Sequence, residues 1–404
     1  MSARVAITGL GAVSALGLDV ASHLAGLKAG TVGIGPLRRV DATTLRSKIG
    51  AEVPEFDPQA YFEPRQLGLL DRSSQMGLIA TREAVAQSGG ALEGVASHRA
   101  GAIFSASIGY WTMEEGYQKL YLDKAPRPHP FTVPRAMPSG TASVVTMDLG
   151  IHGPAFGIAS ACSSASHAMG TAFHMVRSGM LDVAVAGGAE ASMTPGMLRA
   201  WEALRVLSPE GCHPFSRDRS GLVLGEGAAV IVLENLERAR ARGATVLAEM
   251  TGFGMSSDGI DMTAPDTESC ARAMSLALED AGIAPEAVDY VNAHGTATPL
   301  NDKTESAAMR LVFGNRLAAL PVSSTKSMYG HTLSASGALD MVATVLALRE
   351  GFLPPTMGFN EADPECDVDC VPNASRAASP EVAISSSFAF GGLNAVLAVR
   401  RYPG

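Results

Sequence analysis

The stretch ERARARGATVLAEMTGFG, residues 237–254, decides the fold, because one chain pattern ends within it and begins again. Residues 237–243 are typical of a basic helix end closed by Gly243, and residues 246–254 of an apolar strand. On each side of this point, short β-rich apolar runs alternate with helical patterns. The alternation predicts an α/β protein with a mostly parallel sheet covered by helices, duplicated near residue 245. Two unrelated α/β domains are the alternative.

Ten runs carry this prediction, five in each half. Between the first two runs, residues 72–89 have the pattern of a helix. Residues 110–140 hold many aromatic residues and prolines, which break both periodicities, so we expect an excursion that covers a site or a partner. The predicted strands are RVAITG (4–9), AGAIFSAS (100–107), FGIASA (156–161), DVAVAGG (182–188), AAVIVLENL (228–236), VLAEMTGFG (246–254), VDYVNAHGT (288–296), LPVSSTKS (320–327), EVAISSSFAF (381–390) and NAVLAVRR (394–401).

The composition excludes several classes of protein. The 404 residues are 47% apolar, enough for a sizeable core, and 43 glycines with only 5% aromatics favour close approach of helices and strands. A net charge of −9 disfavours nucleic acid as a partner. No signal peptide or membrane span is expected. The five scattered cysteines do not form a disulfide pattern, which favours the cytoplasm, and Cys366 and Cys370 lack a second zinc-like pair, so no metal is expected.

Cys162 stands between a strand pattern and a run of very small residues, FGIASACSSASHAMGTAF (156–173). It should therefore lie at the first turn of a helix, where free backbone N–H groups and the helix dipole stabilise an anion. A helix start can lower the thiol pKa by about one unit or more from about 8.5. This stretch by itself also fits a buried core cysteine.

Three further stretches supply groups that would suit a nucleophilic cysteine. His294 ends a predicted strand in VNAHGTATPLND (291–302), and strand ends are where sites form in parallel sheets. Lys326 and His331 precede a long apolar helix, and Phe390 precedes two glycines that permit close backbone approach. A thiol, neutral imidazoles and backbone N–H donors are the parts of an acyl-transfer site, provided that they meet.

Five motifs in order make the chain resemble an elongating β-ketoacyl-acyl-carrier-protein synthase of the thiolase superfamily, from first strand to last. They are ACSSA (161–165), HPFSRDRSGLVLGEGA (213–228), NAHGTATPLND (292–302), STKSMYGH (324–331) and FAFGGLNAVL (388–397). The resemblance implies a thiolase fold with two pseudo-duplicated βαβαβαββ halves in five αβαβα layers. Residues 1–245 would form the half with the nucleophile and the dimer or cap insertion, and residues 246–404 the half with two catalytic histidines.

The resemblance also assigns roles. Cys162 would accept the acyl chain, while His294 and His331 would bind the extender's thioester carbonyl and drive decarboxylation. Lys326 would order the second histidine and pair with Glu305. The other implied roles are Phe390 as the gate whose N–H joins that of Cys162 in an oxyanion hole, and Thr296 and Thr298 as hydroxyls that hold the phosphopantetheine arm.

Several positions depart from the family pattern. Ala389 and Leu393 replace the usual Gly and Thr around Phe390. Ile108 matches an acyl-tunnel position, and bulky residues such as Trp111 follow it, so both are predicted to line the acyl pocket. The stretch 199–228 is similar to the nodulation-protein-E and polyene-pathway branches, which favours a specialised acyl chain over bulk fatty-acid elongation.

The family implies decarboxylative condensation with malonyl-acyl carrier protein and no cofactor beyond the carrier's phosphopantetheine. A non-catalytic chain-length-factor-like subunit is the alternative, although such subunits typically lack the cysteine. Two related classes fit the motifs less well. Thiolases pair a second cysteine with one histidine and initiating synthases pair His with Asn, whereas this chain has His294 and His331. The expected partners are acyl carrier protein, met by a basic rim of Arg65, Arg72 and Arg205, and a second chain in a homodimer or a heterodimer with a chain-length-factor-like subunit.

Overall fold

The computed structural model describes residues 3–403, and its centre is one ten-stranded sheet. All ten predicted runs contribute a strand to this sheet. In order across the sheet, the strands are β10 (Val322–Ser323), β9 (Tyr290–Asn292), β13 (Val382–Ala389), β14 (Leu393–Arg400), β8 (Ala248–Ser257), β1 (Val5–Val13), β7 (Gly227–Asn235), β6 (Val183–Glu190), β4 (Ala100–Ser105) and β5 (Ala155–Ile158).

The two halves of the sheet repeat one pairing pattern. From β1 outward, the pairs β1–β7 and β7–β6 are antiparallel, and β6–β4 and β4–β5 are parallel. From β8 outward, β8–β14 and β14–β13 are antiparallel, and β13–β9 and β9–β10 are parallel. The halves join where β1 pairs with β8. The expectation of a mostly parallel sheet is wrong, because short connections such as the hairpin between β13 and β14 force antiparallel neighbours.

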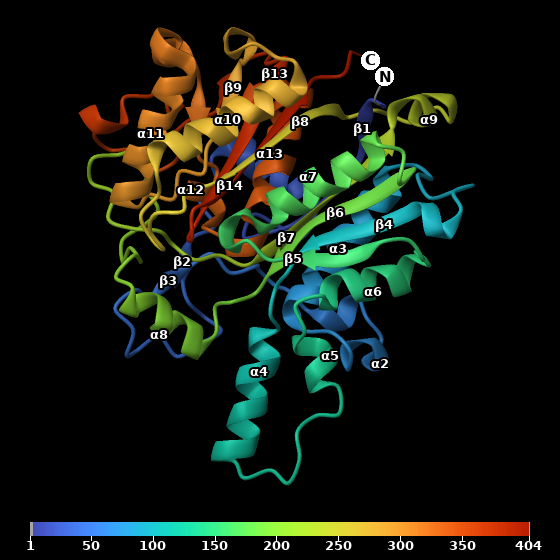
Figure 1. Ribbon diagram of the computed structural model, residues 1–404. Helices are drawn as coiled ribbons and strands as arrows, with labels where there is room; N and C mark the ends of the chain where they lie inside the picture. Colours follow the sequence, from blue (N-terminus) through green and yellow to red (C-terminus); the bar gives the residue numbers. More distant parts are fainter. Residues whose placement is uncertain (1–2, 404) are drawn as a thin grey trace.

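Helices form three layers around the two half-sheets (Figure 1). Helix α3 (Arg72–Gln87) packs on β1 and β7, and α10 (Thr267–Ala281) packs on β8 and β14. Between the half-sheets lie α7 (Ser164–Arg177) and α13 (Ser336–Glu350), which contact strands of both halves. Residues 336–348 of α13 are all buried, as expected for a central helix that is apolar all round. The five-layered αβαβα arrangement is therefore confirmed.

Further elements complete the fold, and among them α12 (Lys326–Tyr329) is entirely buried. The other helices are α1 (Val20–Ala29), α2 (Pro64–Leu67), α4 (Tyr110–Tyr117), α5 (Thr132–Ala136), α6 (Gly140–Leu149), α8 (Pro195–Ala203), α9 (Leu236–Ala241), α11 (Pro299–Phe313) and α12 (Lys326–Tyr329). Two short ribbons pair β2 (Gly35–Pro36) with β3 (Ile49–Gly50), and β11 (Phe352–Leu353) with β12 (Arg376–Ala377). Among residues 3–403, no helix is long and apolar enough to cross a membrane.

Glycines allow the close approach of layers that the composition predicts. Added Cβ atoms at Gly9 and Gly11 of β1 would lie 2.0 Å and 1.8 Å from the carbonyl oxygens of Ala84 and Ala80 in α3. The helix can therefore rest on the strand only where the strand has no side chains on that face.

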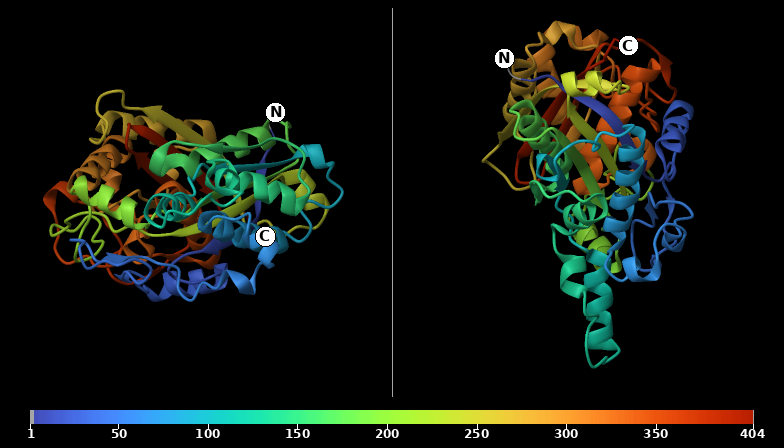
Figure 2. Two further views of the ribbon diagram at one scale, coloured as in Figure 1. Left: turned by 90° about the horizontal axis from the view of Figure 1, so that it is seen from below. Right: turned by 90° about the vertical axis from the view of Figure 1, so that its right-hand side faces the viewer.

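The segment 110–136 projects from the body as an arm (Figures 1 and 2). Helix α4 continues into a π-helical turn, Gln118–Leu122, and the chain returns through α5. Tyr121, Leu122 and Val133 are 65%, 75% and 76% exposed on this arm. The predicted excursion from the sheet is confirmed.

Candidate active site

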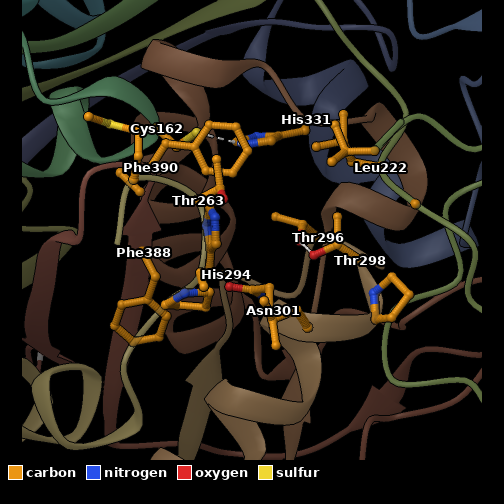
Figure 3. A pocket seen from close by; sticks show the side chains of 18 of the residues that line it. Cys162, Leu222, Thr263, His294, Thr296, Thr298, Asn301, His331, Phe388 and Phe390 are labelled. Atoms are coloured by element: carbon orange, nitrogen blue, oxygen red, sulfur yellow. Dashed lines mark hydrogen bonds between the residues drawn. The ribbon is translucent and has the colours of Figure 1, made fainter. Parts of the chain in front are cut away.

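Cys162, His294 and His331 come from three distant parts of the chain and meet in one site (Figure 3). One side-chain atom from each of the three residues lies within 4.8 Å of the others. The Cys162 sulfur is 3.1 Å from His331 Nε2, and the two imidazole rings meet edge to face with centroids 5.3 Å apart. All three line a cavity of about 320 Å³. The convergence that an acyl-transfer site requires is present.

The local chain places Cys162 in a tight turn. Strand β5 ends at Ile158, a 3₁₀ turn spans Ala161–Ser163, and α7 begins at Ser164. Ala161 has φ of 48°, a strained value for a residue with a side chain. Ser163 Oγ donates to the carbonyl oxygens of Ser387 and Leu393 and so holds this turn against the β13–β14 hairpin. Cys162 thus stands immediately before the helix, close to its predicted position.

Burial controls the charge of the thiol. It raises the pKa of Cys162 to about 12, although the Lys326 charge and the backbone N–H groups of Cys162 and Phe390 act to lower this pKa. The expectation of a thiolate stabilised by the helix start is therefore wrong for the resting site, because desolvation outweighs the helix dipole and the two N–H groups. Those same two N–H groups are the donors predicted for an oxyanion hole, and that role stays a prediction.

The raised pKa predicts how Cys162 reacts with iodoacetamide. Only the thiolate is nucleophilic, and a pKa near 12 leaves the thiol protonated at pH 7. The alkylation rate should therefore rise about tenfold per pH unit from pH 7 to pH 10, with no plateau. The measurement is peptide-resolved mass spectrometry of timed samples. A plateau with a midpoint below the value of about 8.5 expected for the unfolded chain would contradict the burial argument.

Both histidines are held neutral. Burial, reinforced by the nearby Lys326 charge, keeps the pKa of His294 and of His331 well below the usual range. His331 Nδ1 lies 2.6 Å from the hydroxyl oxygen of Ser336, and its Nε2 faces the sulfur. When Nδ1–H donates to Ser336, Nε2 presents a lone pair to the thiol; in the other neutral tautomer Ser336 donates to Nδ1, and Nε2–H can donate to a substrate oxygen. Neutral imidazole donors were expected, but the orienting role of Ser336 was missed.

Lys326 is paired with Asp340, not with Glu305. Its Nζ lies 2.6 Å from Asp340 Oδ2, and neither side chain is exposed to solvent. Asp340 also accepts from the hydroxyls of Tyr329 and Thr325. The sequence did contain a signal for this pair. Asp340 is an acidic residue within a largely apolar helix, and a buried carboxylate requires a partner. Lys326 makes no hydrogen bond to His331 among those found in residues 3–403, so its effect on the histidines is electrostatic.

Glu305 has a different task from the predicted one. Its two carboxylate oxygens accept from the backbone N–H groups of His294 and Gly295 at 2.8 and 2.7 Å. Burial raises the pKa of Glu305 to about 7. The side chain therefore fixes the loop that carries His294, and the predicted pairing with Lys326 is wrong because Asp340 of α13 occupies that place.

Breaking the buried Lys326–Asp340 pair should be strongly destabilising. Asp340→Asn leaves the ammonium without a counter-charge and should reduce the free energy of unfolding by about 3–5 kcal/mol. Urea unfolding followed by circular dichroism measures this change. The control is Lys303→Gln, which breaks an ion pair with Glu365 whose side chains are 53% and 56% exposed, and should cost at most about 1 kcal/mol. Equal losses of unfolding free energy in the two variants would contradict the assignment of Lys326 and Asp340 as a buried ion pair that stabilises the fold.

Phe390, Thr296 and Thr298 line the same cavity as Cys162 (Figure 3). The two threonine hydroxyl oxygens are 2.9 Å apart, and α11 begins directly after Thr298. Phe390 lies in the turn between β13 and β14, where Gly391 and Gly392 have φ of 79° and 66°. These three residues are thus positioned beside the cysteine and the histidines.

Other predicted positions lie elsewhere. Ile108 and Trp111 do not line this cavity; Ile108 is 42% exposed, and Trp111 packs against the core that includes α3. Both lie at the base of the arm, and their role in an acyl pocket stays a prediction. Arg72 is buried in an ion pair with Glu226 and cannot form a basic rim, whereas Arg205 does line the cavity. Cys366 and Cys370 are buried in the core rather than on an exposed loop.

Comparison with known proteins identifies the family to which the chain belongs. Residues 2–239 match the family model described as "Beta-ketoacyl synthase, N-terminal domain", and residues 247–360 match "Beta-ketoacyl synthase, C-terminal domain". Nodulation protein E of Rhizobium sp. (strain N33) is 44% identical over 99% of this chain and 100% of that protein. The 3-oxoacyl-[acyl-carrier-protein] synthase 2 of Synechocystis sp. is 38% identical over 99% of this chain and 98% of that protein.

A solved structure agrees with these matches. The structure described as "The ishigamide ketosynthase/chain length factor" has a TM-score of 0.95 and 34% identity, with 100% of both chains covered. Cys162, the two neutral imidazoles and the N–H groups of Cys162 and Phe390 therefore lie on the fold that these matches share. On this evidence the chain belongs to the β-ketoacyl synthase family and is a condensing enzyme of the acyltransferase type.

Proposed function

We propose that the protein is a 3-oxoacyl-[acyl-carrier-protein] synthase that holds an acyl group on Cys162 and condenses it with malonyl-acyl carrier protein. The observation that supports this most is the meeting of the Cys162 sulfur with two neutral imidazoles in one cavity. The proposed substrates reach the site on the phosphopantetheine of the carrier, with Thr296 and Thr298 contacting that arm. The reaction needs no other cofactor and no metal.

In the first step the Cys162 sulfur attacks the thioester carbonyl of the acyl carrier. In the tautomer that carries its proton on Nδ1, His331 Nε2, 3.1 Å from the sulfur, accepts the thiol proton as the C–S bond forms. The negative charge on the carbonyl oxygen is stabilised by the backbone N–H groups of Cys162 and Phe390. When the bond to the carrier sulfur breaks, His331 returns the proton to that leaving sulfur, and the acyl group remains on Cys162.

In the second step the malonyl thioester binds with its carbonyl oxygen between His294 and His331. Loss of CO₂ moves the electron pair of the broken C–C bond into an enolate, whose oxygen is stabilised by two N–H donors in a buried site. The α-carbon then attacks the acyl-Cys162 carbonyl and forms the new C–C bond. The C–S bond to Cys162 breaks, and the released thiolate takes up one proton from solvent, which balances the loss of the malonyl carboxylate as CO₂, so the site is restored.

Product analysis tests the proposal. The protein is incubated with an acyl carrier protein loaded with a short acyl group and with malonyl-loaded carrier. The expected product is a 3-oxoacyl carrier whose acyl chain is two carbons longer, detected by intact mass, with one CO₂ released for each product. CO₂ release without a longer product would instead support a decarboxylase without condensation.

We propose further that the acyl chain is specialised rather than a bulk fatty acid. The support is the 44% identity to nodulation protein E over the whole chain, against 38% to the Synechocystis synthase, and the fold likeness to the ishigamide ketosynthase. The test measures kcat/KM for acyl carriers loaded with saturated or polyunsaturated chains of equal length. Higher kcat/KM for the unsaturated chains is expected, and a preference for saturated chains would contradict it.

The proposed partners are acyl carrier protein and a second chain, either an identical copy or a chain-length-factor-like subunit. A structure described as a type II polyketide synthase acyl-carrier protein in complex with its ketosynthase has a TM-score of 0.90 and 29% identity to this chain, which supports the first. The second chain would bind the exposed arm and the edge strand β5. We place the protein in the cytoplasm, because all five cysteines are free.

A further inference from the structure

Glu190 is a buried carboxylate near the active site that the proposed reaction does not use. It ends strand β6, and its side chain accepts from Ser334 Oγ at 2.7 Å, from Ser107 Oγ at 3.1 Å and from the Ala191 N–H at 3.1 Å. The hydrogen-bond partners found for it in residues 3–403 are hydroxyl and N–H groups, and none is a cation. A buried charge without a counter-ion is costly, and such groups gather at functional sites.

The bond to Ser334 reaches the turn that carries His331. A 3₁₀ turn spans Leu333–Ala335, between His331 and Ser336, whose hydroxyl oxygen lies 2.6 Å from His331 Nδ1. The first residue of this turn has φ of 45°, a strained value for a residue with a side chain. Such strain persists only where the surrounding structure holds the backbone in place. The Glu190 carboxylate is therefore placed to support the backbone that connects His331 with the serine that orients it.

Two further features hold Glu190 itself in place. Ser107 follows β4 at the base of the arm and donates to one carboxylate oxygen, so the other oxygen is aimed at Ser334. Strand β6 approaches the turn closely because it has no side chain at Gly188, where an added Cβ would lie 3.0 Å from Ala335 Cα. The carboxylate thus has a fixed position from which it can hold the turn.

We propose that the Glu190 carboxylate is a positioning residue for His331, that it does so by holding the Leu333–Ala335 turn, and that its protonation slows acyl transfer to Cys162. This inference rests on the proposed function, because His331 acts as a base only if Cys162 takes up an acyl group. Hydrogen bonds to a charged acceptor are about twice as strong as those to a neutral one, so a neutral carboxyl supports the turn less firmly. Glu190 does not contact the reacting atoms in this scheme.

Glu190 changes charge near neutral pH, whereas its titratable neighbours do not. Burial raises the pKa of Glu190 to about 7, although its hydrogen-bond donors act to lower this pKa. Its charge acts on Cys162 and on Tyr110 of α4, and burial raises the pKa of both, so they stay neutral at pH 8. The pKa of His331 is held well below the usual range. Because the carboxylate forms as the pH rises through 7, acyl transfer should be slower below pH 7 than above it.

The pH profile of acylation tests this role. The acylation rate of Cys162 by an acyl-pantetheine thioester, a donor without the titrating groups of a carrier protein, is measured by intact mass from pH 5.5 to pH 8.5. The rate should rise by about threefold to tenfold to a plateau, with a midpoint near 7, since a misplacement of about 1 Å can cost up to about 10²-fold. In Glu190→Gln, which stays neutral, the rate should be flat and equal to the low-pH rate of the parent. A parent profile without this midpoint, or a rise that survives in Glu190→Gln, would overturn the proposal.

Glu305→Gln is the control for a second buried carboxylate. Burial also raises the pKa of Glu305 to about 7, but this side chain holds the His294 loop, which acylation does not use. Its acylation profile should keep the rise near pH 7, and loss of the rise would refute the assignment to Glu190. Failure of the proposed function is distinct, because the parent would then show no acyl mass on Cys162 at any pH.

Two serine variants test which contact matters, with Glu190 unchanged. Ser334→Ala removes the bond to the turn and should lower the plateau rate by about threefold to tenfold. Ser107→Ala should stay within about twofold of the parent, because the Ala191 N–H still holds the same oxygen. The double variant Glu190→Gln/Ser334→Ala should be no slower than the slower single variant, because both changes remove one contact. Equal rates in the two serine variants, or additive losses in the double variant, would overturn the role of the turn.

Discussion

Cys162→Ala is expected to abolish formation of the 3-oxoacyl product, with a loss of about 10⁴-fold or more, because the sulfur carries the acyl group. Malonyl decarboxylation should survive, since His294 and His331 bind the thioester oxygen without needing the sulfur. Product formation is measured by intact mass of the carrier, and decarboxylation by release of labelled CO₂ from malonyl carrier.

The matched control for this variant is Cys366→Ala. Cys366 is a buried free cysteine that does not line the cavity, so its removal tests the loss of a thiol from the core. This control should keep most of the condensing activity. Substantial product from Cys162→Ala would show that another group accepts the acyl chain.

His294→Ala and His331→Ala are expected to fail at different steps. Each removes one donor to the enolate oxygen and should slow malonyl decarboxylation by about 10²–10³-fold. Only His331 is hydrogen-bonded to the Cys162 sulfur, at 3.1 Å. Acylation of Cys162 should therefore be slowed in His331→Ala and nearly unchanged in His294→Ala.

Single-turnover assays separate the two steps. Acylation is followed by the mass of the protein after mixing with acyl carrier alone, and decarboxylation with malonyl carrier alone. His98→Ala, at an exposed position outside the site, is the control for general effects. Equal acylation rates in the two site variants would contradict the assignment of the proton transfer to His331.

The sequence predicted the fold well where patterns are local. Short apolar runs located all ten strands, and the restart near residue 245 predicted an internal duplication, which the repeated pairing pattern of the two halves shows. The direction of pairing was not predictable from the runs alone, because it depends on connections such as the three-residue turn that makes β13 and β14 antiparallel. The domain boundary at residue 245 stays a prediction.

The candidate site, too, was predictable where the signal is local in sequence and not where it depends on tertiary packing. Strand ends and helix starts indicated Cys162, His294 and His331, and the structure brings all three together. Asp340 was missed because its partner Lys326 is fourteen residues away, and only the packing of α13 shows the pair. The pKa of Cys162 was predicted with the wrong sign, because the cost of burying a thiolate depends on tertiary structure that a helix-start motif does not contain.

The most direct test of the account follows the acyl group itself. The protein is loaded with one acyl group from its carrier, freed of excess carrier and digested, and the acyl mass is mapped to a peptide before and after addition of malonyl carrier. The account predicts the mass on the peptide that contains Cys162, and its transfer to the added carrier as a chain two carbons longer. An acyl mass on any other residue, or one that malonyl carrier leaves on Cys162, would contradict it.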